Sequence, residues 1–97
     1  MQIFPIPTEF EWDKGNTDKN KIKHGVQNQE IEEVFFNIPL LVIGYESHSV
    51  NEGRFLILGT TDDKKKLSII FTIRTGRIRV ISARPMSKKE RELYEKT

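Results

Sequence analysis

Five arginines lie on three consecutive segments of the chain that have the apolar patterning of β-strands. Arg54 opens the first segment, Arg74 ends the second, and Arg77, Arg79 and Arg84 lie on the third. A guanidinium suits phosphate because its planar fork can bind two oxygens at once. If the three segments are neighbours in one sheet, these arginines predict an anion site. Such a site could hold a phosphodiester and stabilise the negative charge that grows on it during cleavage.

The arginines also have an ordinary interpretation as partners of carboxylates on neighbouring strands. For any single arginine we regard that pairing as the commoner arrangement. For the cluster as a whole we favour anion binding. The candidate carboxylates are those of Glu9, Glu11, Glu46 and Glu52.

The charge of the chain is unevenly distributed. The net charge of the whole chain is only +2. Residues 1–63 carry five basic and eleven acidic side chains, which gives a net charge of −6. Residues 64–97 carry eleven basic and three acidic side chains, which gives a net charge of +8. This asymmetry indicates a basic face for a polyanion and an acidic face elsewhere. Solvated strand edges and a charged helix would give the same numbers.

Few side chains could carry protons in such a site. His24 is a candidate general base or acid because its ordinary pKa lies near neutrality, although a histidine is equally well placed at the C-terminal end of a helix. Glu52 is a possible general base or a surface ion pair, and His48 reads as a surface residue in a polar loop. Tyr94 could stack on a base or donate its hydroxyl, or it could pack at the rim of the core.

Several classes of site are excluded or disfavoured by composition. The chain has no cysteine, which excludes disulfides, a thiolate nucleophile and thiolate zinc sites. Its two histidines have no ligand spacing around them, so we expect no metal and no other cofactor. No P-loop, GxGxxG, HExxH or Ser–His–Asp pattern is present. The first residues lack the pattern of a signal peptide and no stretch is long enough to span a bilayer, so we expect a cytoplasmic protein without membrane contact.

The 97 residues predict one α+β domain, with a curved, mainly antiparallel sheet, two N-terminal helices and one C-terminal helix. We expect residues 1–7 to form an extended arm and residues 8–12 a short strand. The four main strands are expected over residues 40–45, 54–59, 67–74 and 77–84, with Thr75-Gly76 as a tight hairpin turn. On the last strand we expect strict alternation, with Ile78, Val80, Ser82 and Arg84 on one face and Arg77, Arg79, Ile81 and Ala83 on the other.

The helices differ in the strength of their signals. From propensity alone, residues 13–24 read as a loop or a frayed helix, with Asp13 as N-cap and Gly25 as stop. Asn28 is expected to cap the next helix, whose apolar face comprises Ile31, Val34, Phe35 and Ile38 and which Pro39 ends. Ser87 and Glu90 predict a capping box for the last helix, which Met86 and Leu93 could dock on the sheet.

A series of short motifs extends along residues 10–95. In order, these motifs are Phe10-Glu11-Trp12-Asp13, Asn20, Lys23-His24-Gly25-Val26, Glu33-Val34-Phe35-Phe36, Glu52-Gly53-Arg54-Phe55, Gly59, Phe71-Thr72, Arg77-Ile78-Arg79, Ile81-Ser82-Ala83-Arg84, and Glu90-Arg91 with Tyr94. The series resembles the BrnT toxins. Each motif is weak alone, and their shared order and spacing make the resemblance specific. One departure is Asn16, where the family usually has lysine, so any role for a cation there is lost.

The resemblance implies a RelE-like fold and metal-independent RNA cleavage that inhibits translation. It also implies neutralisation by a cognate antitoxin with a ribbon-helix-helix DNA-binding part, in a toxin–antitoxin heterotetramer that reaches operator DNA only through the antitoxin. The family comparison further supports a helix between Asp13 and His24.

On this hypothesis Arg54, Arg79 and Arg84 stabilise the transition state, and His24 or Lys23 assists proton transfer or charge neutralisation. Lys21, Arg74 and Arg77 hold flanking phosphates, with Tyr94 as a further RNA contact. Two alternatives remain open. One is a non-catalytic nucleic-acid-binding module, and the other is a toxin on the same scaffold that acts by binding a protein, for instance a topoisomerase.

Overall fold

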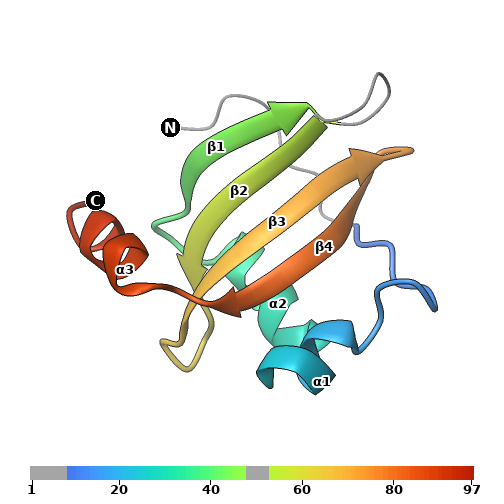
Figure 1. Cartoon of the computed structure of the whole chain (residues 1–97), viewed down its shortest axis with the longest axis horizontal. Coiled ribbons are helices and arrows are strands. Elements are labelled where there is room, and N and C mark those ends of the chain that lie inside the picture. Colours follow the sequence, from blue (N-terminus) through green and yellow to red (C-terminus); the bar gives the residue numbers. More distant parts are fainter. Residues whose placement is uncertain (1–8, 48–52) are drawn as a thin grey trace.

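Four antiparallel strands form one curved sheet in the order of the sequence (Figure 1). The strands are β1 (Leu41–Ser47), β2 (Gly53–Thr60), β3 (Lys66–Arg74) and β4 (Arg77–Pro85). The computed structural model describes residues 9–47 and 53–97. The predicted arm over residues 1–7, His48 and Glu52 lie outside the described residues.

The strands agree with the sequence prediction to within one or two residues, because apolar patterning and turn signals mark them locally. The hairpin between β3 and β4 turns at Thr75 and Gly76, as predicted. Both residues have positive φ, 52° and 76°, which a two-residue turn needs to match the twist of its strands. By contrast, the strand expected over residues 8–12 is reduced, in its described part, to one isolated bridge that joins Phe10 to Ile78 in parallel.

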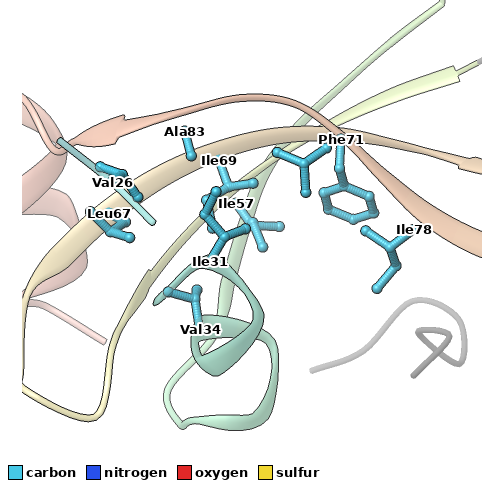
Figure 2. Packing of buried hydrophobic residues seen from close by; sticks show 10 residues of the cluster. Val26, Ile31, Val34, Ile57, Leu67, Ile69, Phe71, Ile78 and Ala83 are labelled. Atoms are coloured by element: carbon cyan, nitrogen blue, oxygen red, sulfur yellow. The ribbon is translucent and has the colours of Figure 1, made fainter. Parts of the chain in front are cut away.

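Two helices pack against one face of the sheet, and a third packs on the other face at one end of the sheet, where Figure 1 shows it beside the strands. On the first face, α1 (Lys19–His24) contacts β4, and α2 (Asn28–Phe36) contacts β2 and β3. Ile31 and Val34 of α2 are fully buried and point toward Ile57 and Ile69 of the sheet (Figure 2). This face holds the main core, whose buried members are Val26, Ile31, Val34, Ile57, Leu67, Ile69, Phe71, Ile78, Val80 and Ala83.

The third helix, α3 (Lys88–Tyr94), contacts β2 through a smaller apolar cluster. That cluster contains Leu58, Met86 and Tyr94. Ile57 and Leu58 are adjacent on β2 and belong to different clusters, because successive side chains of a strand point to opposite faces. The predicted α+β class, with two N-terminal helices and one C-terminal helix on a curved antiparallel sheet, is confirmed.

The boundaries of the first two helices differ from the prediction. α1 begins at Lys19, after a left-handed Asp18, rather than at Asp13, while Gly25 ends it as expected with φ of 71°. Gln27 precedes α2, and its N–H donates to the Glu30 carboxylate, so Asn28 is not the cap. α2 ends at Phe36, which leaves Ile38 beyond the helix and 90% exposed instead of on its apolar face.

The C-terminal helix begins as predicted. The Ser87 hydroxyl accepts a hydrogen bond from the Glu90 N–H (3.2 Å), and the Glu90 carboxylate accepts one from the Ser87 N–H (2.8 Å). Met86 docks on the sheet as expected, but Leu93 is 46% exposed and does not. Tyr94, one residue later, faces the sheet in its place and is buried.

A bulge interrupts the alternation expected on β4. Ile70 pairs with Ser82 and Phe71 with Val80, so Ile81 has no partner in the ladder. The extra residue moves Ala83 to the same buried face as Ile78 and Val80, and it moves Arg84 to the opposite face. The prediction that Arg79 and Arg84 point in opposite directions was therefore wrong.

Candidate functional site

A shallow hollow of about 200 Å³ lies where the segment before α1 meets β2, β3 and β4. Two of the expected site arginines, Arg54 and Arg79, line it together with Arg74. Lys19, the first residue of α1, adds a fourth cation. We call this feature the arginine hollow. Its lining residues are Gly15, Asn16, Lys19, Arg54, Thr72, Arg74, Arg79, Val80 and Ile81.

Arg79 is held in the arginine hollow by two carboxylates. Its guanidinium donates two hydrogen bonds to Asp13 (2.7 and 3.1 Å) and one to Glu11 (3.0 Å). The hydrogen bond from Arg79, followed by one from the Gly15 N–H, lowers the pKa of Asp13. A Cβ atom on Gly15 would come to 2.9 Å from Arg79 Nη2, so a larger residue here would require the guanidinium to shift. Arg79 therefore lies in a fixed position at the wall of the hollow.

Asn16 fastens this wall to the sheet. Its side chain is buried, and its amide group donates to the carbonyls of Glu11 (2.9 Å) and Val80 (3.2 Å). Its amide oxygen accepts a hydrogen bond from the Asp13 N–H (2.8 Å). These three bonds hold the segment that carries Glu11 and Asp13 against β4, and they place the two carboxylates beside Arg79.

Arg54 and Arg74 line the arginine hollow from β2 and the end of β3. Arg54 is exposed and makes no ion pair with the described side chains, those of residues 9–44 and 53–97. Arg74 Nη1 lies 3.7 Å from Glu11 Oε1 and the side chain is 46% exposed. Thr72, between them, is buried and donates its hydroxyl to the Gly53 carbonyl (2.7 Å). An exposed guanidinium on a rigid strand can bind a phosphate oxygen without first breaking an ion pair.

Arg84 lies elsewhere on the same face of the sheet, bound to Glu90 of α3. The two groups form a fork of two hydrogen bonds (2.7 and 3.0 Å), and Ser68 donates a third bond to the same carboxylate (3.2 Å). The hydrogen bonds from Arg84, and next the one from the Ser87 N–H, lower the pKa of Glu90 to about 2. Arg84 thus joins β4 to α3, and it does not line the arginine hollow.

Comparison with known families decides the identity of the chain. A family model described as the ribonuclease toxin BrnT of type II toxin–antitoxin systems matches residues 12–90. The chain belongs to the BrnT family. A search of curated proteins finds no match. The matched residues include all those that line the arginine hollow. The family's activity and class imply an RNA substrate and a protein antitoxin as partner.

The remaining residues that the sequence singled out do not line the arginine hollow of this BrnT protein. His24 lines a separate hollow of about 360 Å³, together with Glu30, Lys65 and Lys66. Lys21 and Lys23 are exposed on α1, and Arg77 is exposed at the start of β4. The predicted group of His24, Lys23, Arg54, Arg79 and Arg84 is therefore not one cluster.

Tyr94 has a structural place in this BrnT chain. Its side chain is only 6% exposed, and its hydroxyl donates to the Pro39 carbonyl (2.6 Å). Neither ring face is open to a nucleobase, so the packing interpretation of Tyr94 holds and the stacking interpretation does not.

Sequence reasoning missed Lys19, Asn16 and Thr72 at the BrnT arginine hollow. The motif Phe71-Thr72 was noticed only as part of the family pattern, and Asn16 only as a lost lysine. Helical spacing does not link Lys19 to Asn16, because α1 begins only at Lys19, after a left-handed Asp18. Within the described residues there is no group of three or more histidines, aspartates or glutamates that could share a metal ion. No helix of that part is long and apolar enough to cross a membrane.

Proposed function

We propose that this BrnT toxin is a metal-independent endoribonuclease that stops translation in the cytoplasm by cutting RNA. The observation that carries the proposal is the arginine hollow, where Arg54, Arg74, Arg79 and Lys19 surround a space open to solvent. These side chains come from four separate parts of the chain, and they supply the positive charge that a phosphodiester under attack requires.

The proposed reaction is attack by the 2′-hydroxyl of RNA on the adjacent phosphorus. The O2′–P bond forms and the P–O5′ bond breaks. A base takes the proton of the 2′-hydroxyl, and an acid gives a proton to the departing O5′. The products are a 2′,3′-cyclic phosphate and a 5′-hydroxyl. Cations must stabilise the extra charge on the phosphate oxygens, and proton carriers must serve the two reacting oxygens. Guanidiniums can do the first task without a metal ion.

We assign the scissile phosphate to Arg54 and Arg79. Arg54 is exposed on β2. Arg79 is fixed by Glu11 and Asp13, so its remaining N–H groups keep one orientation. Lys19 would supply a cation at this wall of the hollow, in place of the lysine that the family usually has at the position of Asn16. Arg74 would hold a neighbouring phosphate.

Other cations are assigned to RNA outside the arginine hollow. His24 lines its own hollow with Lys65 and Lys66, which supports contact with a more distant phosphate better than proton transfer at the scissile one. For Lys21, Lys23 and Arg77, exposure supports the same kind of contact. Arg84 would have to leave Glu90 before it could bind RNA, so we propose that it mainly stabilises the free toxin.

We further propose that the antitoxin carries a ribbon-helix-helix DNA-binding part and forms a heterotetramer with the toxin. Operator DNA would then be bound only through the antitoxin. The resemblance of the chain to BrnT toxins supports this arrangement. Molar mass measured by light scattering on the purified pair, with operator gel shifts of toxin, antitoxin and complex, would test it. A gel shift by toxin alone would contradict it.

The function is tested by incubating antitoxin-free protein with a defined RNA in excess chelator and identifying both new ends. We expect cleavage that persists in chelator, yields 2′,3′-cyclic phosphate and 5′-hydroxyl ends, and stops when antitoxin is added. Activity that requires a divalent cation would refute metal independence. Salt-sensitive binding without new ends, with or without ribosomes, would instead support the non-catalytic module.

A further inference from the structure

A second hollow, of about 250 Å³, lies on the outer face of the sheet beside the arginine hollow. Arg54 lines both hollows, so they share one wall. The second hollow is built from β1, β2 and β3, and we call it the aliphatic hollow. Its lining residues are Ile43, Gly44, Arg54, Phe55, Leu56 and Ile70.

The strand register explains why the two hollows adjoin. Leu56 pairs with Gly44 on one side and with Ile70 on the other, so these three residues form a row across three strands. Leu56 is two residues from Arg54, and Ile70 is two residues from Thr72. Residues two apart on a strand share a face and lie about 7 Å from each other. The aliphatic row therefore lies directly next to the row that carries the cation.

The aliphatic hollow is open to solvent, whereas another part of the same face is covered by the C-terminal region. Leu58 is fully buried beneath Met86 and Tyr94 of the C-terminal region, whereas Leu56 and Ile70 are only half-buried. Gly44 lies at a bulge in β1 and adds no side chain, which leaves space beside Leu56. The result is an apolar depression with a guanidinium at one edge.

We propose that the aliphatic hollow holds one unstacked nucleobase of the RNA, next to the phosphate bound in the arginine hollow. This inference rests on the proposed function. Phosphate and ribose are too polar for aliphatic walls, whereas the face of a base is apolar and gains from such contact. The volume is suited to a single base. Arg54 lies between the hollows, where a guanidinium can bond a phosphate oxygen and stack on a base.

The test measures binding of a short RNA of fixed sequence in which each nucleotide in turn lacks its base. For the wild-type protein, loss of one particular base should weaken binding by roughly 5-fold, the lower end of the range for stacking on an aromatic side chain, because aliphatic walls give apolar contact without an aromatic platform. Loss of the other bases should have much smaller effects. Cleavage of the same RNAs is measured in parallel.

Two variants change the hollow without removing a cation. A Cβ atom on Gly44 would lie 3.7 Å from the Leu56 Cβ, an ordinary contact, so Gly44→Ala narrows the hollow without displacing the sheet. Ile70→Thr keeps the branch at Cβ but replaces the ethyl group with a hydroxyl, which makes the floor polar. Ile38→Thr, the same change at a residue that is 90% exposed away from this face, is the matched control.

The expected result is that Gly44→Ala and Ile70→Thr weaken binding of the intact RNA but not of the RNA that lacks the critical base, while Ile38→Thr changes neither. Equal wild-type binding of all the RNAs would overturn the proposal, as would variants that weaken every RNA alike. If the two variants impair antitoxin binding and leave base dependence intact, the hollow belongs to the antitoxin. Base dependence without cleavage, both in the absence and in the presence of ribosomes, would refute the nuclease function and leave the base site standing.

Discussion

At the scale of single residues, the two arginines assigned to the phosphate are held in different ways. Arg79 is fixed by two carboxylates from the segment before α1, whereas Arg54 extends from β2 with no ion pair among the described residues. A site that combines a fixed donor with a free donor needs little reorganisation when phosphate enters. Asp13 lies 66 positions from Arg79 in sequence, so this pairing depends entirely on the fold.

Glu90 predicts a specific dependence of stability on pH. Its folded pKa of about 2 is below the ordinary value of 4.5, so its contribution is fully present above pH 4.5 and is lost as the pH falls toward 2. Because Arg84 is 40% exposed, we expect Glu90→Gln to lower the free energy of unfolding by only about 1–2 kcal/mol at pH 7. The measurement is urea unfolding of both proteins at pH 7 and pH 3.

The difference between wild type and Glu90→Gln should shrink by roughly half at pH 3, because the carboxyl is then protonated in the unfolded protein but still mostly ionised in the folded one. Glu92→Gln on the exposed side of α3 is the control and should alter stability little. A difference that stays constant from pH 7 to pH 3 would show that the ion pair with Arg84 contributes no stability.

At the scale of elements, α1 is attached to β4 mainly by a side chain rather than by its own propensity. Asn20 is buried, and its amide oxygen accepts the Ala83 N–H (3.0 Å). Asn20→Ala leaves that buried N–H without a partner, so the free energy of unfolding should fall by about 1–3 kcal/mol. Ile22→Ala, at a residue of α1 that is 86% exposed, is the control. Equal denaturation midpoints for the two variants would argue against this anchor.

The approach of α2 to the sheet depends on a glycine. A Cβ atom on Gly59 of β2 would meet Val34 Cγ1 at 2.6 Å and Leu40 Cδ1 at 3.2 Å. Gly59→Ala should therefore lower the free energy of unfolding by about 1–3 kcal/mol, because the helix must move outward. Gly44→Ala, which creates only an ordinary contact, should stay close to wild type in the same thermal melts. Similar melting of both variants would contradict the close packing.

The sequence predicted the strands better than the helices for a physical reason. Strands β2, β3 and β4 carry their own patterning and turn residues, including Gly76. The helix α1 does not, because Gly15 and Asn16 before it serve Arg79 and β4 instead of the helix. The bulge at Ile81 has no local signal, and it decides which face Arg84 occupies. The arginines could thus be predicted as a group, but their division between two places could not.

At the scale of the whole molecule, the two faces of the sheet have different roles. Among the described residues, α1 and α2 close one face over the main core, and α3 covers the other face near Leu58. The open part carries the arginine hollow and the aliphatic hollow. The basic second half of the sequence supplies this face together with Arg54 and Lys19.

Binding of RNA to this face should depend strongly on salt. For a single strand, each phosphate contact contributes a slope of about 0.7 in a plot of log affinity against log salt concentration. Lys19→Ala should reduce the slope by about that amount, and Lys14→Ala, which does not line the hollow, should leave it unchanged. A non-cleavable 2′-deoxy analogue titrated at several salt concentrations gives the slopes. Identical slopes for the two variants would exclude a phosphate contact by Lys19.

The most direct test of the central claim compares cleavage of a single-site RNA by Arg54→Ala and Lys89→Ala, at equal folded content and in excess chelator. Lys89 is exposed on α3, and Lys89→Ala removes one positive charge outside the arginine hollow. We predict that Arg54→Ala slows cleavage by on the order of a hundredfold or more, because a transition-state donor is lost, while Lys89→Ala cleaves like wild type. Cleavage by Arg54→Ala at the wild-type rate would contradict the assignment of the phosphate to the arginine hollow.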